Sequence, residues 1–112
     1  MIAASNRFHG TNSLNYVYRQ GRTLRSKFFS VKYAVNNRRE TYRLAVVVSR
    51  KVAKSAVTRN QIRRRLYELF RTEVAAGVKN VDVVINVFDA SIAEMPADKL
   101  KSTFLYTFRD LK

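Results

Sequence analysis

The chain has 112 residues, and its 22 Lys and Arg against 8 Asp and Glu give a formal net charge of +14. Hydrophobic residues make up 46% and Cys is absent, so we expect one domain over residues 1–112 without disulfides, zinc–thiolate sites or thiol catalysis. No apolar run approaches the ~18–20 residues of a bilayer-spanning helix, and no signal peptide is visible, so we expect a cytoplasmic protein with no membrane partner and a polyanion as ligand.

The positive charge is concentrated in the first two-thirds of the chain. Residues 1–72 hold 17 of the 22 basic residues and only two of the eight acidic ones, whereas residues 73–112 are close to neutral. Residues 50–71 alone carry eight basic side chains against Glu68. Because such a cluster repels itself until an anion relieves it, we expect the polyanion to lie over this segment.

The first half of the chain predicts one helix and two strands. Residues 1–10 are expected to form an irregular arm, and residues 12–20 a short helix that ends before Gly21. Residues 28–35 alternate as a strand does, residues 36–41 are a polar turn, and residues 42–49 form a nearly continuous β-branched run. Two strands with a short polar connection predict a hairpin.

The second half predicts a long helix, a strand and a last helix. A basic loop at residues 50–57 leads into a helix over 58–76, where Thr58 and Gln61 fit a capping box and Gly77 marks the end. Residues 81–88 form a third strand, residues 89–95 a loop, and Pro96 begins the last helix.

These elements give the order α-β-β-α-β-α, which predicts an α+β fold built as a single α-β sandwich. The strands 42–49 and 81–88, with the helix between them, form a βαβ unit, so we expect them to run parallel. The general rule for such crossovers is right-handed.

Residues for independent catalysis are scarce. The only His is His9, the carboxylates are scattered without ligand-like spacing, and the three Gly are isolated. The sequence therefore offers no metal site of its own, no phosphate-cradling loop and no nucleophile with its base, which argues against a nuclease that acts alone.

A helical projection of residues 58–76 separates an apolar stripe from a basic one. Leu69, Ile62, Leu66 and Phe70 fall within about 280° to 20° when Arg59 is placed at 0°. An adjacent stripe, within about 0° to 140°, contains Arg59, Arg63, Tyr67, Asn60, Arg71 and Arg64. Arg65 lies on the other side of the apolar stripe. Guanidinium groups suit bidentate phosphate contacts and stacking on bases, so the basic stripe predicts an RNA-binding surface.

The segment VSRKVAKSAVTRNQIRRRLYELFR, residues 48–71, resembles the signature of the bacterial ribonuclease P protein subunit. The matching residues are Ser49, Arg50, Lys51, Arg59, Asn60, Arg63 and Arg64. The order of the other elements also resembles that family over nearly the whole chain. Three positions depart from its pattern: Gln61, Tyr67 and Phe88 stand where the family usually has Arg.

The resemblance implies a protein that assists a catalytic RNA. In that family the RNA subunit removes the 5′ leader of precursor tRNA, using Mg²⁺ held mainly by RNA, and the protein binds both the RNA subunit and the leader. The fold would contain an unusual left-handed βαβ crossover. The leader would lie in a cleft between the sheet and the basic helix.

Site residues are expected from the matched positions together with the rest of the basic segment and the aromatic and basic residues of the first half of the chain. Contacts with RNA are expected from Arg50, Lys51, Lys54, Arg59, Asn60, Arg63, Arg64, Tyr67 and Arg71. The leader cleft is expected to include Tyr18, Lys32 and Tyr33. No protein metal ligand and no catalytic side chain are expected.

A structural RNA-binding protein, such as a ribosomal protein, is the alternative, because small size, high charge and an α+β fold suit it equally. Duplex-DNA binding is not expected, because no helix-turn-helix pairing is visible.

Overall fold

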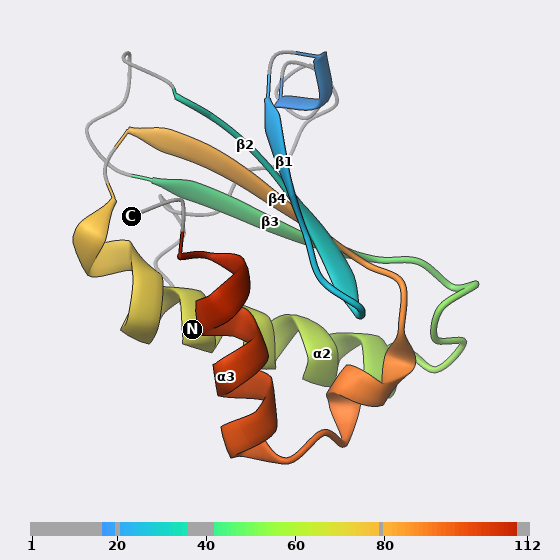
Figure 1. Cartoon of the computed structure of the whole chain (residues 1–112). Helices are drawn as coiled ribbons and strands as arrows, with labels where there is room; N and C mark the ends of the chain where they lie inside the picture. Colours follow the sequence, from blue (N-terminus) through green and yellow to red (C-terminus); the bar gives the residue numbers. More distant parts are fainter. Residues whose placement is uncertain (1–16, 20, 36–41, 79, 110–112) are drawn as a thin grey trace.

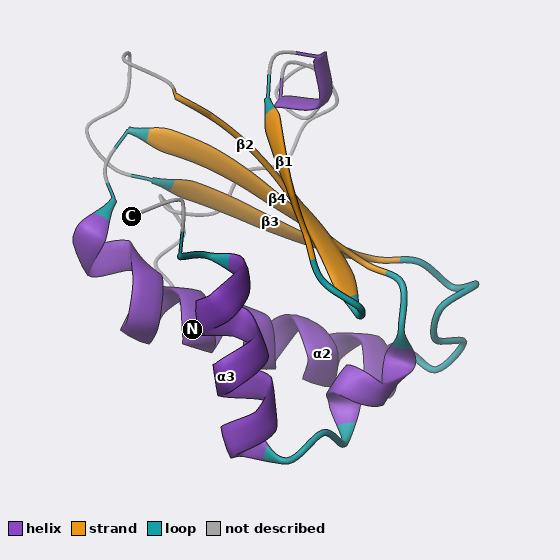
Figure 2. Ribbon diagram, viewed as in Figure 1, coloured by secondary structure: helices purple, strands orange, loops and turns teal. Residues whose placement is uncertain are grey.

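A computed structural model describes residues 17–19, 21–35, 42–78 and 80–109. The strands are β1 (Arg22–Arg25), β2 (Phe29–Val35), β3 (Arg43–Val48) and β4 (Val81–Val87), and the principal helices are α2 (Ala56–Leu69) and α3 (Ala97–Thr107). Residues 17–19 form a helical turn before β1. The sheet lies above α2 and α3, and the helical turn lies on its opposite side (Figures 1 and 2). The α+β sandwich is thus confirmed, with one strand more than the sequence predicted.

The four strands are arranged in the order β1-β2-β4-β3. β4 pairs antiparallel with β2 and parallel with β3, so the predicted parallel pair is confirmed. The predicted hairpin is wrong, because β4 separates the two strands that were expected to pair. All β4 residues except Asn86 are buried, and a strand that is apolar on both faces belongs in the interior of a sheet.

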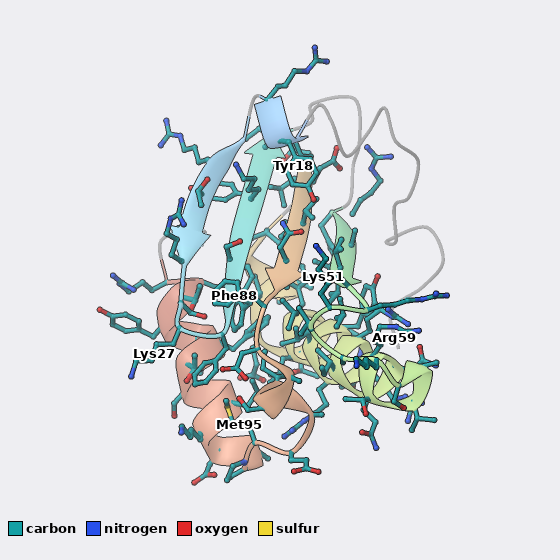
Figure 3. The ribbon with its side chains drawn as sticks, turned by 90° about the vertical axis from the view of Figure 1, so that its right-hand side faces the viewer. Tyr18, Lys27, Lys51, Arg59, Phe88 and Met95 are labelled. Atoms are coloured by element: carbon teal, nitrogen blue, oxygen red, sulfur yellow. The ribbon has the colours of Figure 1, made fainter. Side chains whose placement is uncertain are left out.

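The crossover from β3 through α2 to β4 is left-handed. In Figure 3 the two strands run toward the reader, α2 lies below them, and β4 lies to the left of β3. In this view a right-handed crossover, with its helix below the sheet, would place β4 to the right of β3. β4 lies on the left, so the crossover has the opposite of the usual hand. The hand implied by the family resemblance is confirmed.

The main core lies between the sheet and the two helices. The strands contribute alternate residues such as Leu44 and Ile85, and α2 contributes Ile62 and Leu66, all fully buried. Phenylalanines from β2, the end of α2 and α3 complete it. The Phe104 and Phe108 rings lie 4.5 Å apart between centroids, and Phe70 meets Phe108 edge-on at 5.6 Å. Tilted and edge-on ring pairs stabilise the fold beyond the burial of their apolar surface area.

A smaller apolar cluster lies on the other face of the sheet. Val17, from the helical turn, packs on Ala34, Ala45 and Val84. Gly21 follows this turn and donates its backbone N–H to the carbonyl of Val17 at 2.7 Å. A Cβ at residue 21 would lie 2.3 Å from that carbonyl oxygen, so only glycine allows the chain to close here. The expected helix end at Gly21 is confirmed, while residues 12–16, 20 and the turn at 36–41 lie outside the described residues.

Besides one-residue shifts at strand ends, β1 and the two ends of the long helix differ from the sequence prediction. β1 was not predicted, because its sequence RTLR offers only Leu24 as an apolar residue; charged side chains of this kind are common on edge strands. The predicted capping box at Thr58 is wrong: Ser55 is the N-cap and its hydroxyl accepts the Thr58 N–H at 3.4 Å. The helix then continues beyond Leu69 as a π-helical turn (Phe70–Val74) and a 3-10 turn that ends at Gly77.

An ion pair joins the two parallel strands. Arg43 donates from Nε and Nη2 to the two carboxylate oxygens of Asp82, at 2.9 and 2.7 Å. The Asp82 side chain is 1% exposed and that of Arg43 is 17% exposed. A charge this deep in the protein needs its partner, because water cannot replace it.

We therefore predict that Asp82→Asn lowers the free energy of unfolding by about 3 kcal/mol, because the Arg43 charge stays buried without a counter-charge. Urea denaturation measures the change. The double variant Arg43→Leu/Asp82→Leu is the matched control, and it is expected to recover most of the stability. A cost below about 1 kcal/mol for Asp82→Asn, typical of exposed pairs, would contradict the prediction.

Candidate nucleic-acid interface

The basic loop after β3 is fixed by the first turns of α2. Arg59 donates from Nη1 to the carbonyl oxygens of Ala53 and Lys54, at 2.9 and 2.8 Å. Ala53 is itself buried in the main core, and its N–H donates to the Ser49 carbonyl at 3.1 Å. These bonds hold residues 49–55 against the N-terminal end of the helix, so the loop and the helix present one continuous surface.

This surface gathers exposed cationic and amide groups. Arg63 donates from Nη2 to Oδ1 of Asn60, which orients both side chains on the outer face of α2. Lys51 and Arg59 lie on the same side of the molecule (Figure 3). The exposed and half-buried polar residues of this loop and of the first turns of α2, termed the basic surface below, are Arg50, Lys51, Lys54, Arg59, Asn60, Arg63 and Arg64.

Arg65 has a different environment from its two neighbours. Its guanidinium donates to the carbonyls of Ile92 and Ala93, at 2.6 and 3.2 Å, and to the carbonyl of Met95 at 2.7 Å. These carbonyls belong to the 3-10 turn Ala90–Ala93 and the residues after it. Arg65 therefore ties α2 to the loop before α3, which agrees with its predicted position on the far side of the apolar stripe.

Tyr67 and Arg71 are engaged with other protein groups. The hydroxyl of Tyr67 accepts the Val46 N–H at 3.4 Å, and its ring packs against the main core. Arg71 bonds to Glu68, and this guanidinium lowers the pKa of the Glu68 carboxyl below its usual range. The structure does not bring these two residues into the basic surface, because both lie further along the helix.

A second polar site lies on the sheet face that the helices do not cover. The Tyr18 hydroxyl donates to Oδ1 of Asn86 at 3.2 Å, and the Lys32 ammonium lies 5.9 Å from the centre of the Tyr18 ring. Tyr18 is 38% exposed. Three residues from the helical turn, β2 and β4 thus form an accessible aromatic and cationic patch, termed the open sheet face.

Two expectations about the cleft need correction. The space between the sheet and α2 is filled by the main core, so it cannot hold a leader. Tyr33 alternates with Lys32 along β2 and packs against that core, so it lies on the opposite face from Tyr18. Asn86 was not predicted. Its signal in the sequence was a lone amide within the β-branched run VDVVINV.

Within residues 17–19, 21–35, 42–78 and 80–109, no three His, Asp or Glu side chains are grouped as a metal site would require. In the same ranges no helix has both the length and the apolar character to span a bilayer.

Comparisons with known proteins agree on one family. The family model described as ribonuclease P matches residues 2–112. A ribonuclease P protein component from Pseudanabaena is 30% identical over 96 residues, which cover 86% of this chain and 81% of the relative. The protein component from Alkaliphilus metalliredigens is 26% identical over 111 residues, which cover 99% and 97% of the two chains.

Solved structures are similar in fold. The ribonuclease P protein of Staphylococcus aureus superposes with a TM-score of 0.82 at 20% identity, over 96% of this chain and 95% of its own. The protein from Thermotoga maritima gives 0.80 at 22% identity, over 95% and 97%. With the family model spanning almost the whole sequence, the chain belongs to the ribonuclease P protein family.

Proposed function

We propose that this protein is the cytoplasmic subunit of ribonuclease P that binds the catalytic RNA through the basic surface and the 5′ leader of precursor tRNA on the open sheet face. The observation that carries the proposal is the pair of separate sites. One is rich in guanidinium groups suited to phosphates. The other combines an exposed tyrosine, a lysine and an amide, which suits unpaired bases.

The chemistry of the two sites explains why the basic surface is assigned to phosphates and the open sheet face to unpaired bases. The basic surface offers many cations and the positive end of the α2 dipole, which bind phosphates without reading sequence. The open sheet face is small and its ring is accessible, so it can stack on one or two bases. In this proposal Mg²⁺ is held mainly by RNA phosphates, and the hydrolysis takes place on the RNA subunit.

Reconstitution tests the proposal directly. The protein is mixed with a bacterial ribonuclease P RNA and precursor tRNA at low Mg²⁺ concentration. We expect faster release of the 5′ leader than with the RNA alone, because the added cations lower the repulsion between the two RNAs. Failure to stimulate cleavage would refute the proposal. Cleavage by the protein without the RNA subunit would refute the assignment of catalysis to RNA.

The basic surface also predicts a change in salt dependence. We expect Arg63→Ala/Arg64→Ala to weaken binding to the RNA subunit and to reduce the slope of log K against log salt by about one unit for each arginine. Lys101→Ala/Arg109→Ala removes the same charge from α3 and its C-terminal end, and it is the matched control. An equal change in slope for both double variants would show that only total charge matters.

A conservative substitution separates charge from geometry at the loop. Arg59→Lys keeps the charge, but a lysine ammonium cannot reproduce the geometry with which the guanidinium holds the Ala53 and Lys54 carbonyls. We expect weaker binding to the RNA subunit with an almost unchanged salt slope, because the loop is no longer fixed. Arg64→Lys, at an exposed position with no fixed partner among the bonds described above, is the control. Affinity equal to wild type for Arg59→Lys would refute a role for the fixed loop.

A further inference from the structure

The end of β4 presents a large aromatic side chain to solvent. Phe88 is 52% exposed, although it follows directly after a strand whose residues are almost all buried. A single exposed phenylalanine is common on protein surfaces, so a role for Phe88 has to be argued from what surrounds it.

Phe88 lies between the basic loop, the open sheet face and the segment that contains Met95. Val48 and Val87 are register partners in the parallel pair, so the basic loop leaves the sheet beside Phe88. Alternation along β4 places Asn86 and Phe88 on the same face, so Phe88 continues the open sheet face beyond Asn86. In Figure 3, Tyr18, Phe88 and Met95 follow one another down the molecule, with Lys27 on the outer side.

A pocket of about 290 Å³ lies beyond Phe88. It is lined by Phe28, Ser91, Glu94, Met95, Pro96 and Lys99. Phe88 is linked to it through its backbone, because its N–H donates to the carbonyl of Phe28 at 3.1 Å. The Lys99 ammonium lies 5.9 Å from the centre of the Phe28 ring, so an aromatic wall and a cation stand side by side.

Both sides of this pocket are held in place by the protein itself. The Ser26 hydroxyl accepts the N–H groups of Phe28 and Phe29, at 3.2 and 3.1 Å, which fixes the turn that carries the Phe28 ring. On the opposite side, Arg65 holds the carbonyls of Ile92, Ala93 and Met95. A pocket fixed in this way loses little conformational entropy when a ligand enters.

We infer that Phe88 and this pocket extend the open sheet face into a longer track for single-stranded RNA, in which a base of the leader stacks on Phe88 and the next unpaired nucleotide enters the pocket. The inference rests on the proposed function and names additional residues for it. Every base can stack on an aromatic ring, so this contact does not depend on the leader sequence. Lys27 and Lys99 supply cations for the backbone, and the Glu94 carboxylate can accept a hydrogen bond from a base amino group.

The occupant is assigned to the leader on grounds of continuity and charge. Phe88 shares a sheet face with Tyr18 and Lys32, whereas the basic surface lies around the end of the sheet on α2. Lys99 in the pocket and Lys27 on the outer side offer cations to a polyanion, with the Glu94 carboxylate as the one acidic group among the described residues that line the pocket. A leader that leaves the open sheet face along β4 meets Phe88 first and the pocket next.

The test uses the reconstituted holoenzyme and two precursors, one with a long leader and one with its leader cut back to the nucleotides nearest the cleavage site. We expect Phe88→Ala to weaken binding of the long-leader precursor by about fivefold or more, and to leave the short-leader precursor unchanged. Lys99→Ala is expected to show the same pattern with a smaller loss. A fluorescent base analogue placed along the leader will be quenched at one position by wild type and not by Phe88→Ala.

Two exposed residues of α3 serve as matched controls. Tyr106 is 67% exposed and Lys101 faces Glu73, and neither lines the pocket. Tyr106→Ala and Lys101→Ala should bind both precursors as wild type does. Thermal unfolding of each variant establishes that the fold is retained, which the exposure of Phe88 leads us to expect.

Several outcomes would overturn the inference. Equal losses for the two precursors, or a loss of affinity for the RNA subunit alone, would assign Phe88 to the RNA subunit. No loss for Phe88→Ala, while wild type still prefers the long leader, would refute the extended track and leave the proposed function standing. No preference of wild type for the long leader would refute leader binding itself.

Discussion

The double burial of β4 is the constraint on which the rest of the structure depends. Val83 and Ile85 face the two helices, while Val84 faces the opposite side and is also fully buried. A strand of this kind is stable only with a neighbour on each edge and a cover on each face. The requirement places β4 between β2 and β3, and it calls for apolar cover on both sides of the sheet.

Among the described residues, apolar cover on the second side is confined to one end of the sheet. Val17 covers the small residues at one end of that face. Further along β4, the strand presents Asn86 beside Tyr18, where polar and aromatic groups replace aliphatic ones. One face of the sheet therefore packs against the main core, while the other carries the small apolar cluster at one end and the polar and aromatic groups of the open sheet face further along.

Much of the fold could be predicted from local patterns. The strands, the long helix and the parallel βαβ unit follow from β-branched runs and helical spacing. The strand order could not, because alternation within β2 and β3 does not say which strand lies between them. β1 was missed because RTLR carries almost no periodic signal, and the helix start was missed because Ser55 and Thr58 are both acceptable N-caps.

The sequence predicted which types of residue form the candidate site, but it did not predict the contacts that each of them makes. The arginines of α2 look equivalent in the sequence, yet Arg59 and Arg65 point their guanidinium groups at backbone carbonyls. Helical projection separated Arg65, since it depends only on angle. It could not reveal that Arg59 holds a loop, because that contact depends on where the chain before the helix folds. Tyr33 was misplaced although its alternation with Lys32 along β2 already puts the two side chains on opposite faces of the sheet.

The three carbonyl contacts of Arg65 have a consequence for any mutational survey of this helix. Arg65 joins α2 to the loop that forms one side of the Phe28 pocket. Replacing Arg65 would release that loop and loosen α2 at the same time. Binding at the basic surface and at the pocket would then both weaken, even if Arg65 itself contacts no nucleotide. A scan that reads affinity alone would assign Arg65 to the same class as Arg63 and Arg64. Only a parallel measurement of folding stability separates an arginine that supports the fold from the arginines proposed to contact RNA.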